Sequence, residues 1–136
     1  MSYIDDDTTE DQFLQWEFNG SNRIEWFLRF AGGIDGSVRF AQAAGTDGLG
    51  TINSANDAYS QGVDVPFSLA ARHGAAFING AVNGALLTED NSTSALPDLS
   101  ETDLELANDF NGFIEEFRMW PEDIADAGIE AASAIT

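Results

Sequence analysis

Cysteine is absent from this 136-residue sequence, and basic residues are scarce. Without cysteine, the chain can form neither disulfide bonds nor metal sites built on thiolates. Five Lys and Arg residues stand against 24 Asp and Glu residues, which gives a formal net charge of −19 at pH 7. A field of that sign repels phosphate, so nucleic acids and anionic membrane surfaces are poor partners, whereas basic protein surfaces are favoured.

Long apolar runs are missing as well, and no stretch is long enough to span a bilayer. The first residues, MSYIDDDTTED, have no basic start and no apolar core, so we expect no secretory signal. The one histidine, His73, precedes a glycine, which predicts a turn or surface position rather than a metal ligand or a base. No nucleophile–histidine pattern or phosphate-binding glycine loop occurs, and we predict neither enzymatic activity nor a cofactor.

Alternating apolar and polar residues are the strongest pattern that the sequence does contain. Residues 13–18 (FLQWEF) and 23–30 (RIEWFLRF) flank an Asn-Gly pair and predict a β-hairpin. Further short strands are predicted at 37–42, near Thr51, at 65–72, in a hairpin of 75–79 and 81–87 that turns at Asn79-Gly80, at 103–107 and at 112–120. Many short strands with frequent turn signals indicate an antiparallel β-sandwich.

Arginines are concentrated in the first three predicted strands, at Arg23, Arg29 and Arg39. Their positions predict a ladder that pairs with neighbouring acids on one face of a sheet. Surface pairs of this kind contribute little to stability, so the ladder is a structural feature.

The end of the chain carries the clearest motif, NGFIEEFRMWPEDIADAGIEAA. Its apolar residues share one face if a β-bulge lies near the two consecutive glutamates. Pro121 would end this strand, and a short acidic helix would follow it. We predict that the strand closes the core through Gly112, Ile114, Phe117, Met119 and Trp120.

This motif resembles the last strand and closing helix of laminin-G-like, concanavalin-A-like sandwich domains. The matching positions are Gly112, Ile114, Phe117, Arg118 and Trp120, followed by Ala127 and Ile129 in the helix. Upstream, residues 76–80 (AFING) resemble the family's "lyvNG" hairpin, and residues 103–107 (DLELA) resemble its "lrlG" strand. The likeness covers residues 65–134 and implies an all-β antiparallel jelly roll with a short C-terminal helix. The expected organisation is an acidic arm at 1–12, the β-sandwich at 13–120, and the helix and tail at 121–136.

Tailed-phage virion proteins carry a similar version of this domain, with a "salP" segment like residues 94–97. The resemblance implies a non-enzymatic virion structural protein, made in the host cytoplasm, that decorates the capsid or is attached to the tail. A lectin-like module that binds host or matrix carbohydrate is the alternative, for which Trp16 and Trp26 would need to be exposed. Glycanase activity is a third, less favoured reading.

Acidic residues at 101–105 (ETDLE) are the candidates for glycanase chemistry. Glu101, Asp103 and Glu105 alternate onto one face of a strand, as the carboxylates of sandwich glycanases do. An ordinary surface strand has the same pattern, and we favour that interpretation. Calcium ligands are an open question, because nothing in the spacing selects among the loop aspartates Asp47, Asp57, Asp64 and Asp90.

The N-terminal arm is too acidic to serve as a central strand beside the closing strand. An uncovered strand edge offers unpaired N–H and C=O groups to a neighbour. We therefore expect another chain to complete the sandwich, with Tyr3 and Ile4 in the contact. The partner would be a second copy, with a trimer favoured, or a basic virion protein.

Overall fold

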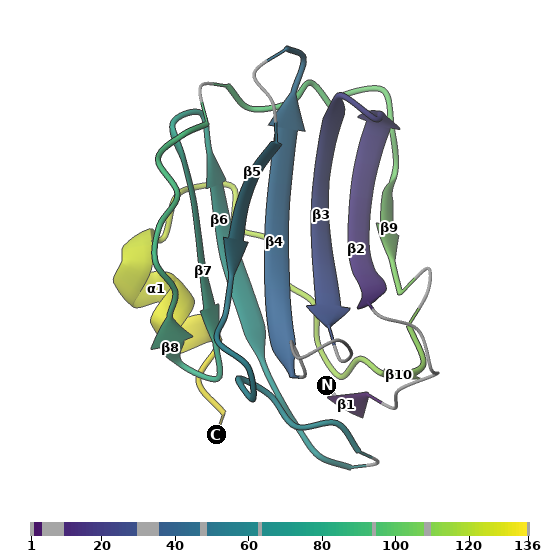
Figure 1. Cartoon of the computed structure of the whole chain (residues 1–136), viewed down its shortest axis with the longest axis vertical. Helices are drawn as coiled ribbons and strands as arrows, with labels where there is room; N and C mark the ends of the chain where they lie inside the picture. Colours follow the sequence, from purple (N-terminus) through teal and green to yellow (C-terminus); the bar gives the residue numbers. More distant parts are fainter. Residues whose placement is uncertain are drawn as a thin grey trace.

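Two antiparallel sheets face each other in the computed structural model of the chain, and one short helix follows them (Figure 1). The structure describes residues 2–3, 10–29, 36–46, 49–62, 64–93, 95–107 and 110–135. The sheets have five and three strands, so the predicted all-β antiparallel sandwich with a short C-terminal helix is confirmed.

The five-stranded sheet has the order β5-β4-β3-β2-β9. The predicted first hairpin is confirmed, because β2 and β3 pair in antiparallel around a turn at Gly20-Ser21. The strand expected near Thr51 is β5, which lies at one edge of the sheet. The bounds are β2 (Glu10–Asn19), β3 (Asn22–Arg29), β4 (Ser37–Ala44), β5 (Leu49–Asn53) and β9 (Leu104–Leu106).

The outward face of this sheet carries the predicted arginine pairs. Arg23 Nε lies 2.7 Å from a carboxylate oxygen of Glu25, and Arg39 Nη2 lies 2.9 Å from Glu10. Arg29 approaches the second oxygen of Glu10 at 3.4 Å. Arg39 also lies over the ring of Phe27, 4.1 Å from its centroid. Because alternate side chains of a strand point to opposite faces, Leu28 and Phe40 are directed into the core.

The three-stranded sheet has the order β6-β7-β8, with β6 (Leu69–Gly74), β7 (Phe77–Val82) and β8 (Ala85–Leu86). Its second turn is at Asn83-Gly84, where both residues have positive φ, so the turn predicted at Asn79-Gly80 is wrong. Gly80 lies inside β7 for a packing reason. A Cβ there would stand 2.5 Å from the ring of Phe40, so glycine is needed for the close approach of the opposite sheet.

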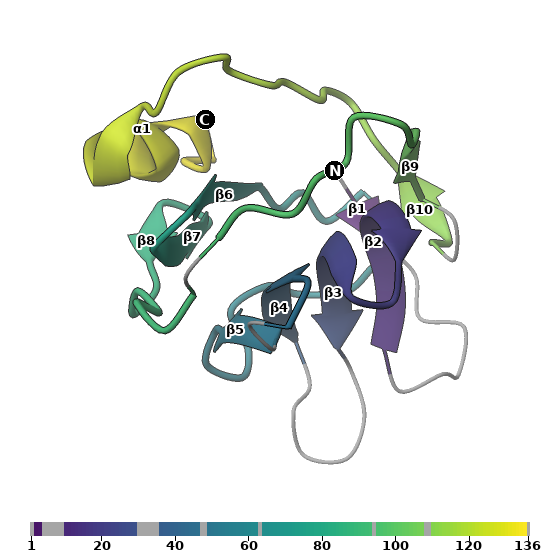
Figure 2. The same ribbon diagram turned by 90° about the horizontal axis from the view of Figure 1, so that it is seen from above.

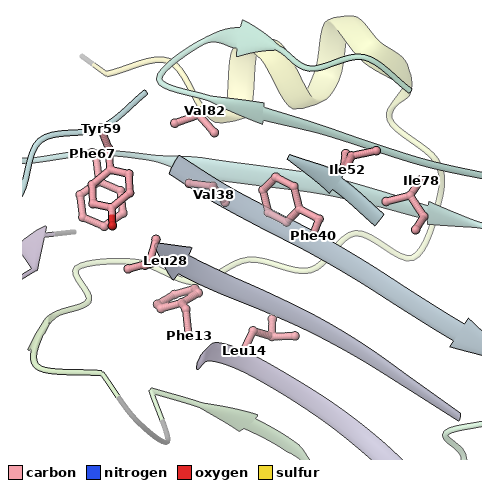
Figure 3. Close-up of a cluster of buried hydrophobic side chains, with 10 residues drawn as sticks. All are labelled: Phe13, Leu14, Leu28, Val38, Phe40, Ile52, Tyr59, Phe67, Ile78 and Val82. Atoms are coloured by element: carbon pink, nitrogen blue, oxygen red, sulfur yellow. The ribbon is translucent and has the colours of Figure 1, made fainter. Parts of the chain in front are cut away.

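The main core fills the space between β2–β5 and the β6–β7 hairpin (Figure 3). Phe40 and Leu28 are fully buried at its centre, and Tyr59 packs on Phe67 with ring centroids 4.8 Å apart. The buried members of the cluster are Phe13, Leu14, Leu28, Val38, Phe40, Ile52, Tyr59, Phe67, Ile78 and Val82.

The helix α1 (Ala125–Ala132) covers the other face of the small sheet. Ile129 is buried there against Ala70 and Ala81, and Ile124 packs on the same cluster, whereas Ala127 is exposed. The helix begins at Ala125, so residues 121–123 precede its first turn rather than form it. Among the described residues, no helix is long and apolar enough to cross a membrane.

The predicted closing strand is mostly not a strand. Only Gly112–Phe113 forms one (β10), and it pairs with Ser2–Tyr3 (β1). Ile114 packs against the core as predicted, whereas Phe117, Met119 and Trp120 are 36%, 59% and 46% exposed. Among the described residues, only Ser2 and Tyr3 pair with this part of the chain, and two consecutive glutamates leave it without a continuous apolar face.

The N-terminal arm also differs from its predicted bounds. Strand β2 begins at Glu10, inside the range 1–12. The backbone of Tyr3 pairs with Gly112 of the same chain, while Ile4 lies outside the described residues.

Replacing Phe40 and Phe117 separately tests this division between core and surface. Phe40→Ala should lower the free energy of unfolding by about 3–5 kcal/mol, because the ring is fully buried against Gly80. Phe117→Ala should cost about 1 kcal/mol or less, because the side chain is exposed on an unpaired segment. Denaturant unfolding measures both values. Equal losses would place residues 114–120 in the core after all.

Candidate functional site

A cleft of about 1200 Å³ opens between the two sheets on the side where β6 is the edge strand. Its floor is the inward face of the five-stranded sheet, where Trp16, Ile24 and Trp26 lie. One side is β6, and residues 96–100 also line the space. Residues 114–124, called the closing segment below, run from β10 to α1 (Figure 2) and line the cleft with most of their side chains. Its two ends contact the sandwich, through Ile114 in the core and through Asp123, which pairs with Arg72 of β6.

The cleft exists because the three-stranded sheet is too narrow to cover the whole inward face of the five-stranded sheet. On the opposite side the sandwich is closed, since Asp90 pairs with Ile78 of β7 and its carboxylate accepts the Thr51 N–H of β5 at 3.1 Å. No comparable link joins β6 to β2 or β9 among the described residues. The inward side chains of β2 and β3 are therefore partly uncovered, and Trp16 and Trp26 are only partly buried.

Strand β6 presents a free backbone edge to this cleft. The Ser68 C=O accepts the Asn83 N–H at 2.9 Å, which fixes the direction of hydrogen bonding along the strand. Because these directions alternate in an antiparallel pair, the N–H and C=O groups of Leu69, Ala71 and His73 point away from β7. We call this row the free edge. None of these three residues has a described strand on that side.

The closing segment has unpaired backbone as well. Residues 114–120 make no backbone hydrogen bond with any other residue that the structure describes. Its exposed apolar side chains, Phe117, Met119 and Trp120, line the cleft together with acidic neighbours. The site thus combines an apolar floor, an unused strand edge and a covering segment that is not integrated into either sheet.

His73 lies inside the sandwich, so the predicted turn or surface position is wrong. It belongs to β6 and its ring stacks on Trp26, with the centroids 6.3 Å apart. The Trp26 Nε1–H donates to Nε2 of His73 at 3.1 Å, and Nδ1 lies 3.1 Å from Oε1 of Gln42. The buried Gln42 amide nitrogen donates to the carbonyl oxygens of Gly74 and Ala95 at 3.0 and 2.8 Å.

These contacts hold His73 in a single neutral form. Gln42 uses its nitrogen for two carbonyls, so its oxygen faces the imidazole and Nδ1 must carry the hydrogen. Nε2 accepts from Trp26 and has no place for a second hydrogen. Burial lowers the pKa of His73 from 6.5 to about 4, and the donor from Trp26 works in the same direction.

Negative charge dominates the rim of the cleft. Asp98, Glu115 and Glu122 line it and have no basic partner among the described residues. The two arginines of the rim are already neutralised. Arg118 pairs with Glu116 at 2.5 Å, and Arg72 makes a bidentate contact with Asp123 at 2.6 and 2.7 Å.

The Arg72 cluster fixes the helix on the small sheet. Besides Asp123, the guanidinium contacts Asp126 at the start of α1 and lies over the ring of Phe77. Hydrogen bonding to Asp123 raises the pKa of Arg72, and the same contact lowers the pKa of Asp123. This anchor sets where the closing segment ends, because Asp123 is its second-last residue.

The acidic residues weighed as glycanase candidates lie as in the favoured interpretation, an ordinary surface strand. Glu101 lies in the turn before β9, and Asp103 and Glu105 are exposed on the outside of the sandwich. Leu104 and Leu106 pack inward, as in an ordinary edge strand. Asp103 and Glu105 border a shallow pocket of about 360 Å³. Its other lining residues are Gln15, Glu17, Phe18 and Thr102, so it is more polar than the cleft.

The loop aspartates do not converge on a metal site. Among the described residues, no group of three or more Asp, Glu or His side chains is placed to hold a metal ion. Asp57 and Asp64 are exposed with positive φ, and Asp47 lies outside the described residues. Hydrogen bonds from Ser92, with one from the Thr51 backbone, lower the pKa of Asp90.

Sequence reasoning missed the Gln42–His73–Trp26 contact, although one signal was present. Gln42 continues the inward phase of Val38 and Phe40 in β4, and a polar residue in a core phase requires buried partners. Trp26 shares the inward phase of Leu28 in β3, and it packs edge-on against Phe40 with ring centroids 5.0 Å apart.

Comparison with known proteins adds a fold likeness and no family. No family model and no curated protein matches the chain. A solved structure with a similar fold is that of residues 221–444 of an S-layer domain-containing protein from Clostridium thermocellum ATCC 27405. The two chains are 20% identical, the match covers 96% of this chain and 66% of that one, and the TM-score is 0.42. This similarity concerns the β-sandwich alone.

The lowered pKa of His73 predicts a specific loss of stability in acid. The unfolded chain binds the proton near pH 6.5 and the folded chain near pH 4, so stability is complete above 6.5 and falls as the pH drops between these values. The full loss is about 3 kcal/mol.

Urea unfolding of the native protein and of His73→Gln over this pH range measures the effect. The carboxylates are common to both proteins, so the difference between their pH slopes isolates the histidine. Identical slopes would show that His73 titrates normally in the folded protein.

Proposed function

We propose that this β-sandwich is a non-enzymatic structural protein of a tailed-phage virion that works by binding another protein of the particle. The observation that carries the proposal is the free edge of β6 beside an apolar cleft, with Phe117, Met119 and Trp120 exposed next to it. Unpaired strand edges and exposed apolar side chains are features of protein-binding surfaces.

The charge of the chain supports a basic partner. A net charge of −19 disfavours nucleic acid and favours a positively charged protein lattice, such as a basic capsid or tail surface. The resemblance of residues 65–134 to the virion version of laminin-G-like domains supports the particle as the location. Whether the chain decorates the capsid or the tail is left to experiment.

We propose the closing segment, rather than the N-terminal arm, as the part of the chain that contacts the partner. Tyr3 already pairs through its backbone with Gly112 of the same chain, whereas residues 114–120 have no described backbone partner. A homo-oligomer, with a trimer favoured, is retained as part of the proposal for a particle with local threefold axes.

Carbohydrate binding is the second candidate, because two tryptophans line the cleft. Trp16 and Trp26 are partly buried on its floor, and aromatic faces are common in sugar sites. Both indole N–H groups are already used, by the Thr102 carbonyl oxygen at 3.2 Å and by His73 at 3.1 Å. Glycan-array binding that is lost in Trp16→Ala would favour this candidate over the structural one.

Particles of the phage that encodes the chain should contain the protein at a fixed copy number relative to the major capsid or tail protein. Mass-spectrometric quantification of purified particles tests this. The protein should remain after a high-salt wash that removes adsorbed proteins, since apolar contacts resist screening. Its absence from particles that contain all other structural proteins would refute the proposal.

The acidic residues at 101–105 should have no catalytic role. Glu101→Gln and Glu105→Gln are expected to leave particle assembly unchanged, because both side chains are exposed on the outside of the sandwich. Particle yield and polysaccharide hydrolysis are the two readouts. A polysaccharide-cleaving activity that either substitution abolishes would support the glycanase reading instead.

A further inference from the structure

We infer that the cleft binds an extended segment of a partner protein, in which apolar and basic residues alternate, as a fourth strand added to β6. This inference rests on the proposed function, for which it names the chemical class of the partner. Each part of it comes from a different property of the cleft.

The first property is the free edge. Leu69, Ala71 and His73 direct their N–H and C=O groups into the cleft, in register for one more strand. An extended peptide can satisfy these groups by main-chain hydrogen bonds, which is the usual way in which a sheet edge binds a segment of another protein.

The second property is the difference between the two walls that the added strand would face. A strand directs alternate side chains to opposite sides. One side would meet the apolar floor, where Trp16, Ile24 and Trp26 are only partly covered. The other side would face the closing segment, which carries Glu115 and Glu122 (Figure 2).

The third property is the sign of the charge. Glu115, Glu122 and Asp98 have no basic partner among the described residues, while the nearby arginines Arg72 and Arg118 both pair with acids. Lysine or arginine on the outward side of the added strand would supply the missing counter-charge.

The space is also of a suitable size. At about 1200 Å³, the cleft exceeds the range of about 300–1000 Å³ that small-molecule sites usually have. The cleft is open to solvent, and its apolar lining gains packing contacts when a bound chain displaces water. An added strand fills it and leaves the closing segment as an outer cover over the bound peptide.

A second copy of this chain is a weaker occupant. Its closing segment also has apolar residues and unpaired backbone, but it carries Glu115, Glu116, Glu122 and Asp123 into a rim that is already acidic. Two chains of charge −19 repel each other on approach, whereas a basic segment is attracted.

The experiment uses two fluorescent nine-residue peptides built from the same valines and lysines. In one peptide valine and lysine alternate, and in the other the valines and lysines form separate blocks. Fluorescence anisotropy with the full chain at 0.15 M salt, a condition of about 8 Å screening length, measures binding. The alternating peptide should bind at least about tenfold more tightly than the blocked one, because only it presents one apolar and one basic face.

Amide hydrogen exchange by NMR locates the bound strand. The amides of Leu69, Ala71 and His73 should become protected when the alternating peptide is added, while those of Ala70 and Arg72, which already bond to β7, should change little. The double variant Glu115→Lys with Glu122→Lys should weaken binding at least about tenfold. The matched control, Glu101→Lys with Glu105→Lys, changes the net charge equally on surfaces outside the cleft and should bind as the native chain does.

Three outcomes would overturn the inference. Equal binding of both peptides without new protection would mean attraction by net charge alone. Free-edge amides already protected in the isolated monomer would mean that the chain's own closing segment pairs with β6. Protection that rises with protein concentration, together with a dimer in light scattering, would mean that a second copy fills the cleft.

Other outcomes would distinguish a failure of the proposed virion role from a failure of the strand-binding inference. Peptide binding at the free edge with no protein in purified particles would count against the virion role alone. Particle association that is unaffected by Glu115→Lys with Glu122→Lys would count against the cleft as the contact.

Discussion

The contact between the Phe40 ring and the backbone of Gly80 sets how the two sheets lie on each other. A side chain at position 80 would collide with the ring, so β7 approaches β4 closely at this one position and the small sheet is centred over β4 and β5. Segment 87–93 secures the same side through Asp90, which bonds to both β7 and β5. With the small sheet fixed over one half of the large sheet, β2 and the inner face of β3 are left partly uncovered, and the cleft follows from that offset.

Polar groups at the boundary of the covered half stabilise this arrangement. Gln42 reaches across from β4 to the carbonyl oxygens of Gly74 and Ala95, and its own carbonyl meets His73. A buried polar set of this kind is favourable when each donor and acceptor is matched, and here the neutral His73 matches both Gln42 and Trp26. Through His73, the network holds the end of β6 against β3 and β4. In this position the outer edge of β6 faces the cleft. The free edge is therefore held in place by specific contacts on the inward side of the same strand.

Much of the sandwich could be predicted from the sequence, because its signals are local. The alternation in β3 and β4 identifies strands that the structure contains, and the short helix after Pro121 is present as well. An Asn-Gly pair usually marks a turn, but here Gly80 lies inside β7 because it allows a close contact with Phe40, 40 positions away in the sequence. The segment from Ile114 to Trp120 was also misplaced, because strand formation depends on a partner that alternation alone does not reveal. The position of His73 could not be predicted either, because its partners, Trp26 and Gln42, come from other strands.

The acidity of the chain bears directly on how an open edge can persist in solution. Free strand edges pair with one another unless something opposes it, and like charge is a common means. Here the carboxylates of Asp98, Glu115 and Glu122 surround the edge, and the total charge of −19 acts on every approaching copy. This repulsion weakens as salt shortens the screening length, while backbone pairing and apolar burial do not weaken in the same way. The same charges that oppose pairing between copies would attract the basic strand that we propose, so one feature of the sequence would both protect the edge and favour this partner.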